Sequence, residues 1–130
     1  MPKRIVIVED NAVNRKLVEI ILSKAGYAVS PAADAEQGIA LARSEHPDLI
    51  LMDIHLPGMD GLAATRLLKE DPATRGIPIM ALTALAMNGD EECILAAGCD
   101  AYLGKPIRHE SLLEAVARLL QARGEADART

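Results

Sequence analysis

Side chains that can carry out chemistry follow several short apolar segments of the sequence. They are Glu9, Asp10, Asp53, Thr83 and Lys105. Three carboxylates about 4 Å apart would repel one another by roughly 4 kcal/mol per pair at an effective dielectric of 20. Such a group therefore needs a proton or a cation. Because Mg²⁺ prefers a few carboxylates together with water, we expect a Mg²⁺ site that leaves coordination positions open for a phosphate.

The same set of side chains has the parts of a phosphoryl-transfer site. A carboxylate beside Mg²⁺, a lysine and a threonine can attack a phosphoryl group and form an aspartyl phosphate. The ammonium and hydroxyl groups would then stabilise the phosphoryl oxygens.

Each of these residues also has a purely structural alternative. Asp10 or Asn11 could serve only as the N-cap of a helix. Asp53 could cap a helix or turn before the Pro-Gly pair that follows it, and Thr83 could merely begin a loop. Lys105 could be a solvated loop charge, since exposed lysines are common.

The histidines and cysteines give no comparable pattern. His46, His55 and His109 have no partners at metal-ligand spacing, so we expect surface or loop positions for their side chains. Cys93 and Cys99 fit neither a disulfide framework nor a CxxC motif. We expect them to be small, reduced packing residues.

Apolar segments alternate with helical patterns along the chain, which predicts a parallel α/β sheet. The expected strands are at 4–8, 27–32, 48–53, 77–83 and 101–106. The expected helices are at 13–25, 35–45 and 61–70, then one capped by Asn88 with Glu91 and ending at Gly98, and a last one at 109–123. This is a single doubly wound, flavodoxin-like (βα)5 domain, whose common strand order is 2-1-3-4-5. Proline in the second strand favours an edge position for it.

This topology predicts where the chemistry lies. Ligands bind outside the carboxyl ends of the strands in such sheets, near the switch point between the first and third strands. The acidic, hydroxyl and ammonium groups all follow strands at that edge. Nothing in helix propensity or core packing requires them there, so their convergence is the strongest functional signal in the sequence.

Length and charge narrow the possible functions. The chain has 130 residues, and we assign 1–124 to one domain and 125–130 to a disordered tail. A net charge of −5, with no Phe, no Trp and two Tyr, argues against nucleic acid as a partner. No apolar run reaches the roughly 18–20 residues of a membrane span, so we expect no membrane contact and a cytoplasmic location.

Over residues 3–123 the chain resembles the receiver domain of bacterial two-component response regulators. The matching segments are IVIVEDNAVNRKLV at 5–18, DLILMDIHLPGMDGL at 48–62, PIMALTALAM at 78–87 and AAGCDAYLGKPI at 96–107. Within the family, residues 89–107 look most like stand-alone cell-division regulators of the DivK type, and also like receivers excised from hybrid kinases.

The resemblance implies a role for each site residue. Asp53 would be the phosphoacceptor, and Glu9 and Asp10 would hold Mg²⁺ together with Asp53. The main-chain carbonyl of His55 would be a further metal ligand. Thr83 would supply the switch hydroxyl, Lys105 would contact a phosphate oxygen, and Tyr102 would be the switching aromatic residue. The family often has a cis peptide before the proline that follows this lysine, here Pro106.

The expected function is that of a single-domain regulator. It would accept a phosphoryl group from a phosphohistidine of a sensor kinase or phosphotransfer protein, and signal to a downstream target by protein contacts. An interaction module without phosphorylation and a phosphatase with an aspartyl nucleophile remain as alternatives; the latter would carry a DxD motif at the first strand. A flavin or nucleotide binder is disfavoured, because the acidic EDNAVN loop at 9–14 would repel a phosphate.

Overall fold

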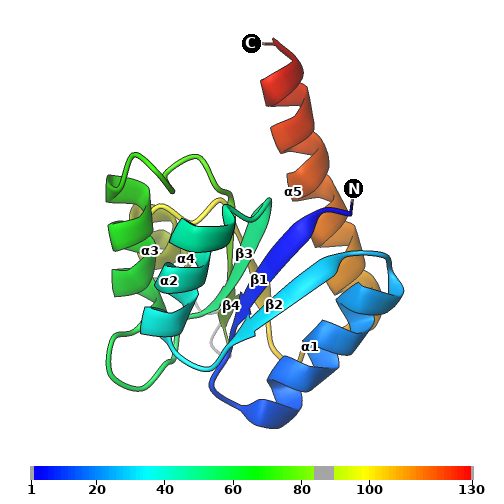
Figure 1. Ribbon diagram of the computed structural model, residues 1–130. Helices are drawn as coiled ribbons and strands as arrows, with labels where there is room; N and C mark the ends of the chain where they lie inside the picture. Colours follow the sequence, from blue (N-terminus) through cyan, green and yellow to red (C-terminus); the bar gives the residue numbers. More distant parts are fainter. Residues whose placement is uncertain (1, 84–89, 130) are drawn as a thin grey trace.

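The computed structural model describes residues 2–83 and 90–129, with side chains for 2–83 and 92–121. It contains one parallel sheet covered by helices on both faces (Figure 1). The strands are β1 (Arg4–Val8), β2 (Ala28–Ala32), β3 (Leu49–Asp53), β4 (Ile79–Thr83) and β5 (Ala101–Gly104). The helices are α1 (Ala12–Lys24), α2 (Ala35–Glu45), α3 (Gly61–Glu70), α4 (Asp90–Ala96) and α5 (His109–Arg129).

The strand order is β2-β1-β3-β4-β5, which confirms the expected doubly wound topology. All four strand pairs are parallel. The predicted edge position of β2 is confirmed, and Pro31 lies there in register with Ile7 of β1. The carboxyl ends of β1 and β3 are adjacent, so the switch point of the sheet lies between Glu9 and Asp53.

Apolar residues alternate between the two faces of the sheet and form one core on each. Ile5 and Ile7 contribute to the core that also contains residues of α1 and α5. Val6 and Val8 contribute to the opposite core, together with residues of α2, α3 and α4. Both cores are mostly aliphatic, with Met52, Met80 and Cys99 among them and a tyrosine packed against each. β3 and β4 are buried along their whole length. A strand buried on both faces needs a continuous apolar sequence, as these two strands have.

Local capping sequences set the ends of the helices. The predicted cap of α2 at Asp34 is confirmed, since Oδ1 of Asp34 accepts a hydrogen bond from Gln37 N–H at 2.8 Å. The return bond of the capping box goes one residue further back, because Oε1 of Gln37 accepts from Ala33 N–H at 3.0 Å and not from Asp34. Asn11 caps α1 and Asp60 caps α3. The predicted cap at Asn88 lies outside the described residues.

Helix α5 departs from the expected chain organisation. We expected it to end near residue 123 and a disordered tail to follow, but its backbone is helical to Arg129. The segment after residue 123 contains two Ala, one Glu and one Arg, which are good helix formers, and no proline. A single glycine at 124 is therefore not sufficient to stop the helix. Figure 1 shows this end of α5 projecting beyond the sheet.

Candidate functional site

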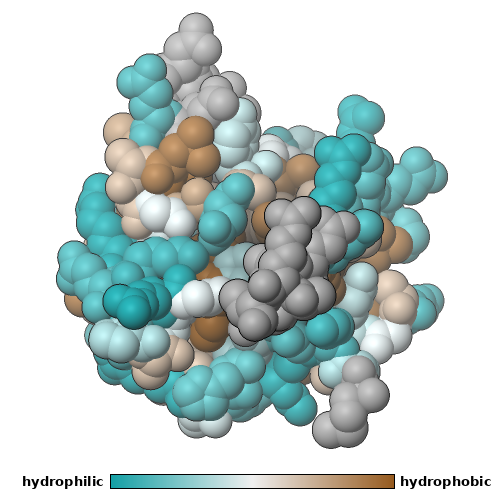
Figure 2. All heavy atoms as spheres, turned by 90° about the horizontal axis from the view of Figure 1, so that it is seen from above, coloured by the Kyte–Doolittle hydropathy of each residue, from teal (hydrophilic) through white to brown (hydrophobic). Residues whose placement is uncertain are grey.

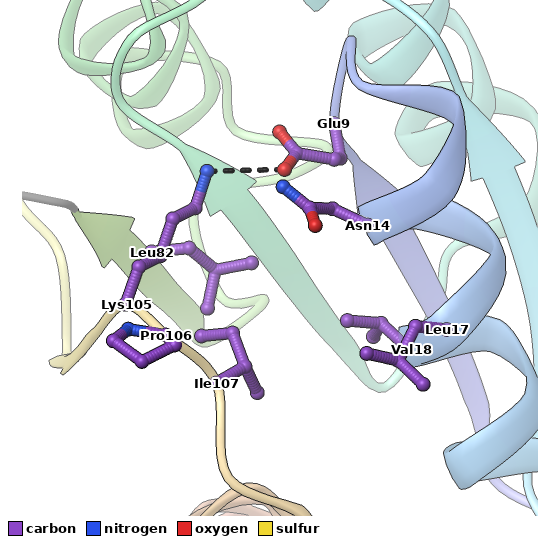
Figure 3. Close-up of a pocket in the computed structure, with 8 residues that line it drawn as sticks. All are labelled: Glu9, Asn14, Leu17, Val18, Leu82, Lys105, Pro106 and Ile107. Carbon is purple, nitrogen blue, oxygen red and sulfur yellow. Dashed lines mark hydrogen bonds and ion pairs between the residues drawn. The ribbon is translucent and has the colours of Figure 1, made fainter.

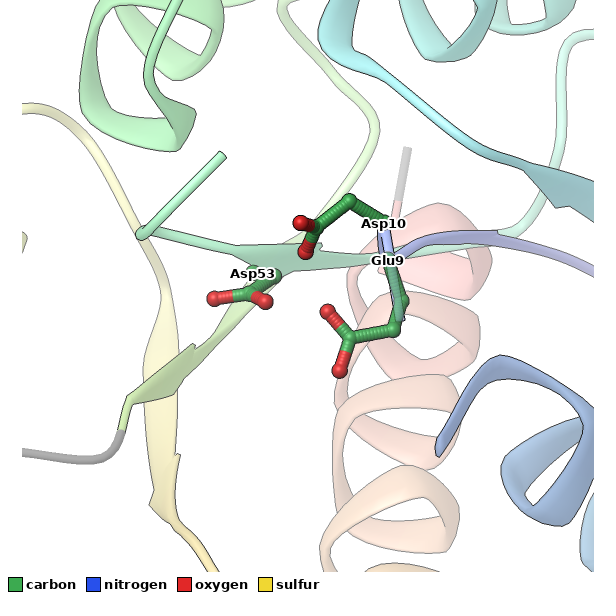
Figure 4. A group of neighbouring side chains, drawn as sticks. All are labelled: Glu9, Asp10 and Asp53. Carbon is green, nitrogen blue, oxygen red and sulfur yellow. The ribbon is translucent and has the colours of Figure 1, made fainter. Parts of the chain in front are cut away.

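The carboxyl edge of the sheet brings three acidic residues together. Glu9 and Asp10 follow β1, and Asp53 ends β3 (Figure 4). One carboxylate oxygen from each lies within 4.8 Å of the other two. Glu9 and Asp53 are 1% and 2% exposed, whereas Asp10 is exposed to solvent. The arrangement is thus two buried carboxylates with a third at the opening.

Lys105 joins the two buried carboxylates. Its Nζ lies 3.0 Å from Oε1 of Glu9 and 2.9 Å from Oδ2 of Asp53. Lys105 follows β5, and its main-chain N–H donates to the carbonyl of Thr83 at 2.7 Å. The peptide bond to Pro106 is cis, as the resemblance implied. The lysine is therefore held at the site by its backbone as well as by its charge.

The second oxygen of Glu9 is the one buried side-chain polar atom without a hydrogen-bond partner in the described part of the chain. An unpaired buried carboxylate oxygen is costly, because it has lost water and gained nothing in return. It lies in a cluster made only of hard oxygen donors, which are the ligands that Mg²⁺ prefers. The residues at this edge therefore fit a divalent cation.

Burial and the neighbouring charges shift the pKa values of these groups in opposite directions. Burial, together with the adjacent Asp53 carboxylate, raises the pKa of Glu9 to about 7. Burial also acts to raise the pKa of Asp53, but the Glu9 carboxyl group, the His55 N–H and the Lys105 ammonium group outweigh it and hold that pKa below its ordinary value. Burial opposes the charge of Lys105, yet Asp53 and Glu9 keep its pKa above the ordinary value. Asp53 is consequently ionised at neutral pH.

The remaining predicted site residues surround this centre. The main-chain N–H of His55 donates to Oδ1 of Asp53 at 2.9 Å, and its side chain is exposed as expected. Thr83 is fully buried at the carboxyl end of β4. Tyr102 is half-buried in β5, in register with Ala81, and packs on the core shared with α2, α3 and α4. Of the structural alternatives, the N-cap of α1 is Asn11 and not Asp10, and the N-cap of α3 is Asp60 and not Asp53. Asp53 does cap the local turn through His55 N–H, but this uses only Oδ1 and leaves Oδ2 to Lys105.

One residue of the site was not expected from the sequence. Nη1 of Arg15 donates to the main-chain carbonyl of Glu9 at 2.8 Å and lies 3.4 Å from that of Asp10. It thereby holds the loop that carries both carboxylates. A signal was present: Arg15 lies near the start of α1, where a positive charge opposes the helix dipole. An arginine at this position is therefore explained by its hydrogen bonds to the loop before α1 and not by its contribution to the helix.

A groove opens next to the site between α1 and the segment after β5 (Figure 3). Its volume is about 400 Å³. It is lined by Glu9, Asn14, Leu17, Val18, Leu82, Lys105, Pro106 and Ile107. The salt bridge between Glu9 and Lys105 lies at its polar end, and apolar side chains from α1 and from residue 107 face each other across it (Figure 3). This groove is continuous with the acidic site.

The face of the molecule opposite the carboxyl edge of the sheet is mainly hydrophilic. Figure 2 shows hydrophilic side chains over most of the face seen from above, with hydrophobic ones in small separate areas. Among the described residues no helix combines the length and the apolar character that crossing a bilayer requires.

Comparisons with known proteins agree with this geometry. Residues 5–117 match the model of the response regulator receiver domain. The chain is 46% identical over 116 residues to the polar-differentiation response regulator DivK of Brucella anthropi, covering 89% of this chain and 94% of that protein. DivK of Brucella melitensis gives the same identity and coverage.

Solved structures share the fold. A CheY-like receiver domain protein from Methanospirillum hungatei superposes with a TM-score of 0.90 at 32% identity, covering 97% of this chain and 99% of that one. The receiver domain of the sensor histidine kinase PA1611 from Pseudomonas aeruginosa has a TM-score of 0.87 at 40% identity, covering 93% of this chain and 99% of that one. That structure holds a magnesium ion in its active-site cleft. The present chain belongs to the response regulator receiver domain family and is similar to DivK.

Proposed function

We propose that Asp53 accepts a phosphoryl group from a phosphohistidine of a sensor kinase or a histidine phosphotransfer protein. The observation that carries this proposal is the position of the Asp53 carboxylate, buried at the switch point of the sheet and 2.9 Å from Lys105 Nζ. The lowered pKa of Asp53 keeps the carboxylate in the ionised, nucleophilic form. A phosphoacceptor needs both properties.

In the transfer step an Asp53 oxygen attacks phosphorus, the P–O bond forms, and the P–N bond to the donor imidazole breaks. The electron pair of that bond leaves with the imidazole nitrogen. Charge develops on the phosphoryl oxygens, and the ammonium group of Lys105 is placed to stabilise it. The N–H of His55, which already donates to Asp53, fixes the orientation of the attacking carboxylate.

Mg²⁺ is the cofactor that this donor set favours. Glu9, Asp10, Asp53 and the main-chain carbonyl of His55 would hold it, and the unpaired oxygen of Glu9 supports that assignment. When bound, Mg²⁺ supplies positive charge that offsets the repulsion between the carboxylates and the incoming phosphoryl oxygens. Arg15 keeps the loop of Glu9 and Asp10 in place for this purpose.

The output of the phosphorylated domain is a contact with a downstream protein. We infer that the Thr83 hydroxyl is drawn to the new phosphoryl oxygens and that Tyr102 repacks in response, with consequences for the surface of α4, β5 and α5. Tyr102 supports this route because it packs on the core that contains Ile94 of α4. A coupling free energy of about 1–3 kcal/mol is sufficient for such a switch.

The groove beside the site is the proposed docking surface for the phosphodonor. The exposed side chain of Leu17 and the half-buried side chain of Ile107 would receive side chains of a four-helix phosphotransfer bundle, whereas Val18 is buried and forms the floor of the groove. Asn14 and Lys105 would provide polar contacts at the same groove, next to the acceptor. A donor bound there brings its phosphohistidine to Asp53.

We further propose that residues 1–124 form the functional unit and that this unit has no enzymatic activity on other substrates. We also propose a cytoplasmic location. The location is supported by two free thiols, Cys93 and Cys99, as is common in a reducing compartment. The acidic balance argues against a nucleic-acid partner. A phosphatase with an aspartyl nucleophile would carry a DxD motif at the first strand, whereas Asp53 ends β3 and is followed by Ile54 and His55. A module without phosphorylation would not need Lys105 beside the carboxylates.

The test is intact-mass measurement after incubation with acetyl phosphate and Mg²⁺. The wild-type chain gains one phosphoryl group, and Asp53→Asn does not. Asp60→Asn is the matched control, because asparagine also caps a helix and the variant removes a carboxylate near the same edge. It should be labelled like the wild type. Equal labelling of Asp53→Asn and the wild type would refute the assignment of Asp53.

A further inference from the structure

The first residue of α3 lies directly against the main chain of Asp53. Gly61 is buried, and its N–H donates to the carbonyl of Ile54 at 3.3 Å. A Cβ atom at Gly61 would overlap the carbonyl oxygen of Asp53. It would also lie 2.7 Å from Cα of Ile54 and 2.9 Å from the carbonyl carbon of Asp53. Cβ atoms do not approach backbone atoms so closely, so a side chain at 61 must displace one of the two segments.

The reason why position 61 requires glycine differs from the reason at the other glycine positions. Gly26, Gly58 and Gly98 have positive φ angles, which suit glycine in turns. Gly61 does not, and alanine is favoured over glycine inside a helix. Gly38 also has a close neighbour, but that neighbour is the side chain of Val8, which is not backbone. The need for glycine at position 61 thus comes from its contact with the backbone that carries Asp53.

Neither side of this contact can easily withdraw. The start of α3 is fixed by the Asp60 cap, whose Oδ1 accepts from Ala63 N–H at 2.7 Å, and by Thr65 Oγ1, which donates to the Gly61 carbonyl at 2.8 Å. On the other side, the N–H of Ile54 donates to the carbonyl of Leu82 in the neighbouring strand at 3.1 Å. Asp53 is consequently held between a fixed strand and a fixed helix.

We propose that Gly61 is a positioning residue for phosphoryl transfer, and that contact between α3 and the Asp53 main chain sets the place of the acceptor carboxylate. The inference rests on the proposed role of Asp53. A methyl group at 61 displaces the Asp53–Ile54 peptide, and with it the hydrogen bond from His55 and the contact with Lys105. Displacement of a reacting group by about 1 Å can lower a rate about 100-fold. The displacement also reaches Ile54, whose side chain belongs to the core packed by α2, α3 and α4, so the folding of the variant is measured separately.

The experiment compares Gly61→Ala with Gly76→Ala in the full chain. A Cβ at Gly76 would have no atom within 4 Å, so this variant is a matched control for the glycine change. Val116→Ala, a core truncation in α5, controls for lost stability. Labelling by acetyl phosphate is followed well below the unfolding temperature, where far-UV circular dichroism shows each chain folded.

We expect Gly61→Ala to be labelled about 10- to 100-fold more slowly than the wild type. Gly76→Ala and Val116→Ala should be labelled at the wild-type rate. Labelling of Gly61→Ala within about twofold of Gly76→Ala would overturn the proposal. Both glycine variants are also made in a His46→Gly background, which is expected to be more stable because His46 ends α2 with a positive φ of 48°. A Gly61→Ala chain that stays unfolded in that background contradicts the proposal.

A second readout does not depend on phosphorylation. In the unlabelled protein, Gly61→Ala should shift the amide resonance of His55, which donates to Asp53, whereas Gly76→Ala should leave it unchanged. If the wild-type chain is not labelled while this shift is present, the proposed function has failed, but the contact of Gly61 with the Asp53 main chain still sets the place of that carboxylate. An unchanged His55 amide in Gly61→Ala would contradict the positioning role itself.

Discussion

Lys105 Nζ lies 2.9 Å from Asp53 Oδ2, although 52 residues separate them in the chain. The same ammonium group lies 3.0 Å from Glu9. One ammonium group therefore balances two buried carboxylates, and it lies where a phosphoryl group on Asp53 would bring new negative charge. Lys105 therefore contributes both to the stability of the folded site and to the proposed phosphoryl transfer.

Replacement of Lys105 tests both parts of this link. Lys105→Gln leaves Glu9 and Asp53 buried without a counter-charge, and we expect the free energy of unfolding in EDTA at neutral pH to fall by about 1–3 kcal/mol. Chemical denaturation measures this loss. The rate of labelling by acetyl phosphate should fall at least about tenfold, because charge on the phosphoryl oxygens is no longer stabilised. Unchanged stability and unchanged labelling together would mean that the two salt bridges have no role.

The raised pKa of Glu9 predicts a pH dependence of stability without Mg²⁺. The folded chain holds the Glu9 proton up to a pKa of about 7, above the ordinary value of 4.5. The folded state thus binds more protons, and the free energy of unfolding decreases as the pH rises from 4.5 to about 7. Glu9→Gln lacks this titration and should unfold a few degrees higher than the wild type at alkaline pH in EDTA.

Thermal unfolding of both chains at several pH values is the measurement. Asp34→Asn, which keeps the cap of α2, is the control for removal of an acid near the same edge of the sheet. A wild-type chain whose stability does not change relative to Glu9→Gln across this range would show that Glu9 is ionised throughout.

The docking groove predicts a separation of two activities. Substitution of Asn14 and Ile107 by alanine should slow transfer from a phosphohistidine donor about tenfold or more, because interface contacts act on binding. Labelling by acetyl phosphate should be unaffected, since that small donor needs no docking surface. Leu67→Ala, an exposed apolar residue of α3, is the control and should change neither rate. Equal losses in both assays would exclude the groove as a docking surface.

The switch is tested with beryllofluoride and Mg²⁺, which mimic the phosphoryl group. In the wild type, amide resonances of residues 92–112 should shift on addition of the mimic, because Thr83 moves and Tyr102 repacks. Thr83→Ala should still be labelled at Asp53 but lose most of these remote shifts. Remote shifts of wild-type size in Thr83→Ala would require a different route from Asp53 to the partner surface.

The sequence predicted the topology and the group of acids for a physical reason. Apolar strands separated by capped helices leave few possible arrangements, and parallel strands bring residues such as Glu9 and Asp53 to one edge. It did not predict which groups are in contact. The bridge from Lys105 and the contact of Gly61 with Asp53 depend on backbone positions that no pattern in the sequence encodes. The extension of α5 to Arg129 was not expected because the apolar stripe of that helix does not continue after residue 123.

The measurement that tests the central claim most directly is chemical location of the phosphoryl group. The chain is phosphorylated by a phosphohistidine donor in Mg²⁺ and reduced with borohydride, which converts an aspartyl phosphate to homoserine. Peptide mass spectrometry then identifies the changed residue. The account predicts homoserine at position 53, and none in a sample without donor. Homoserine at another aspartate, with Asp53 unchanged, would contradict it.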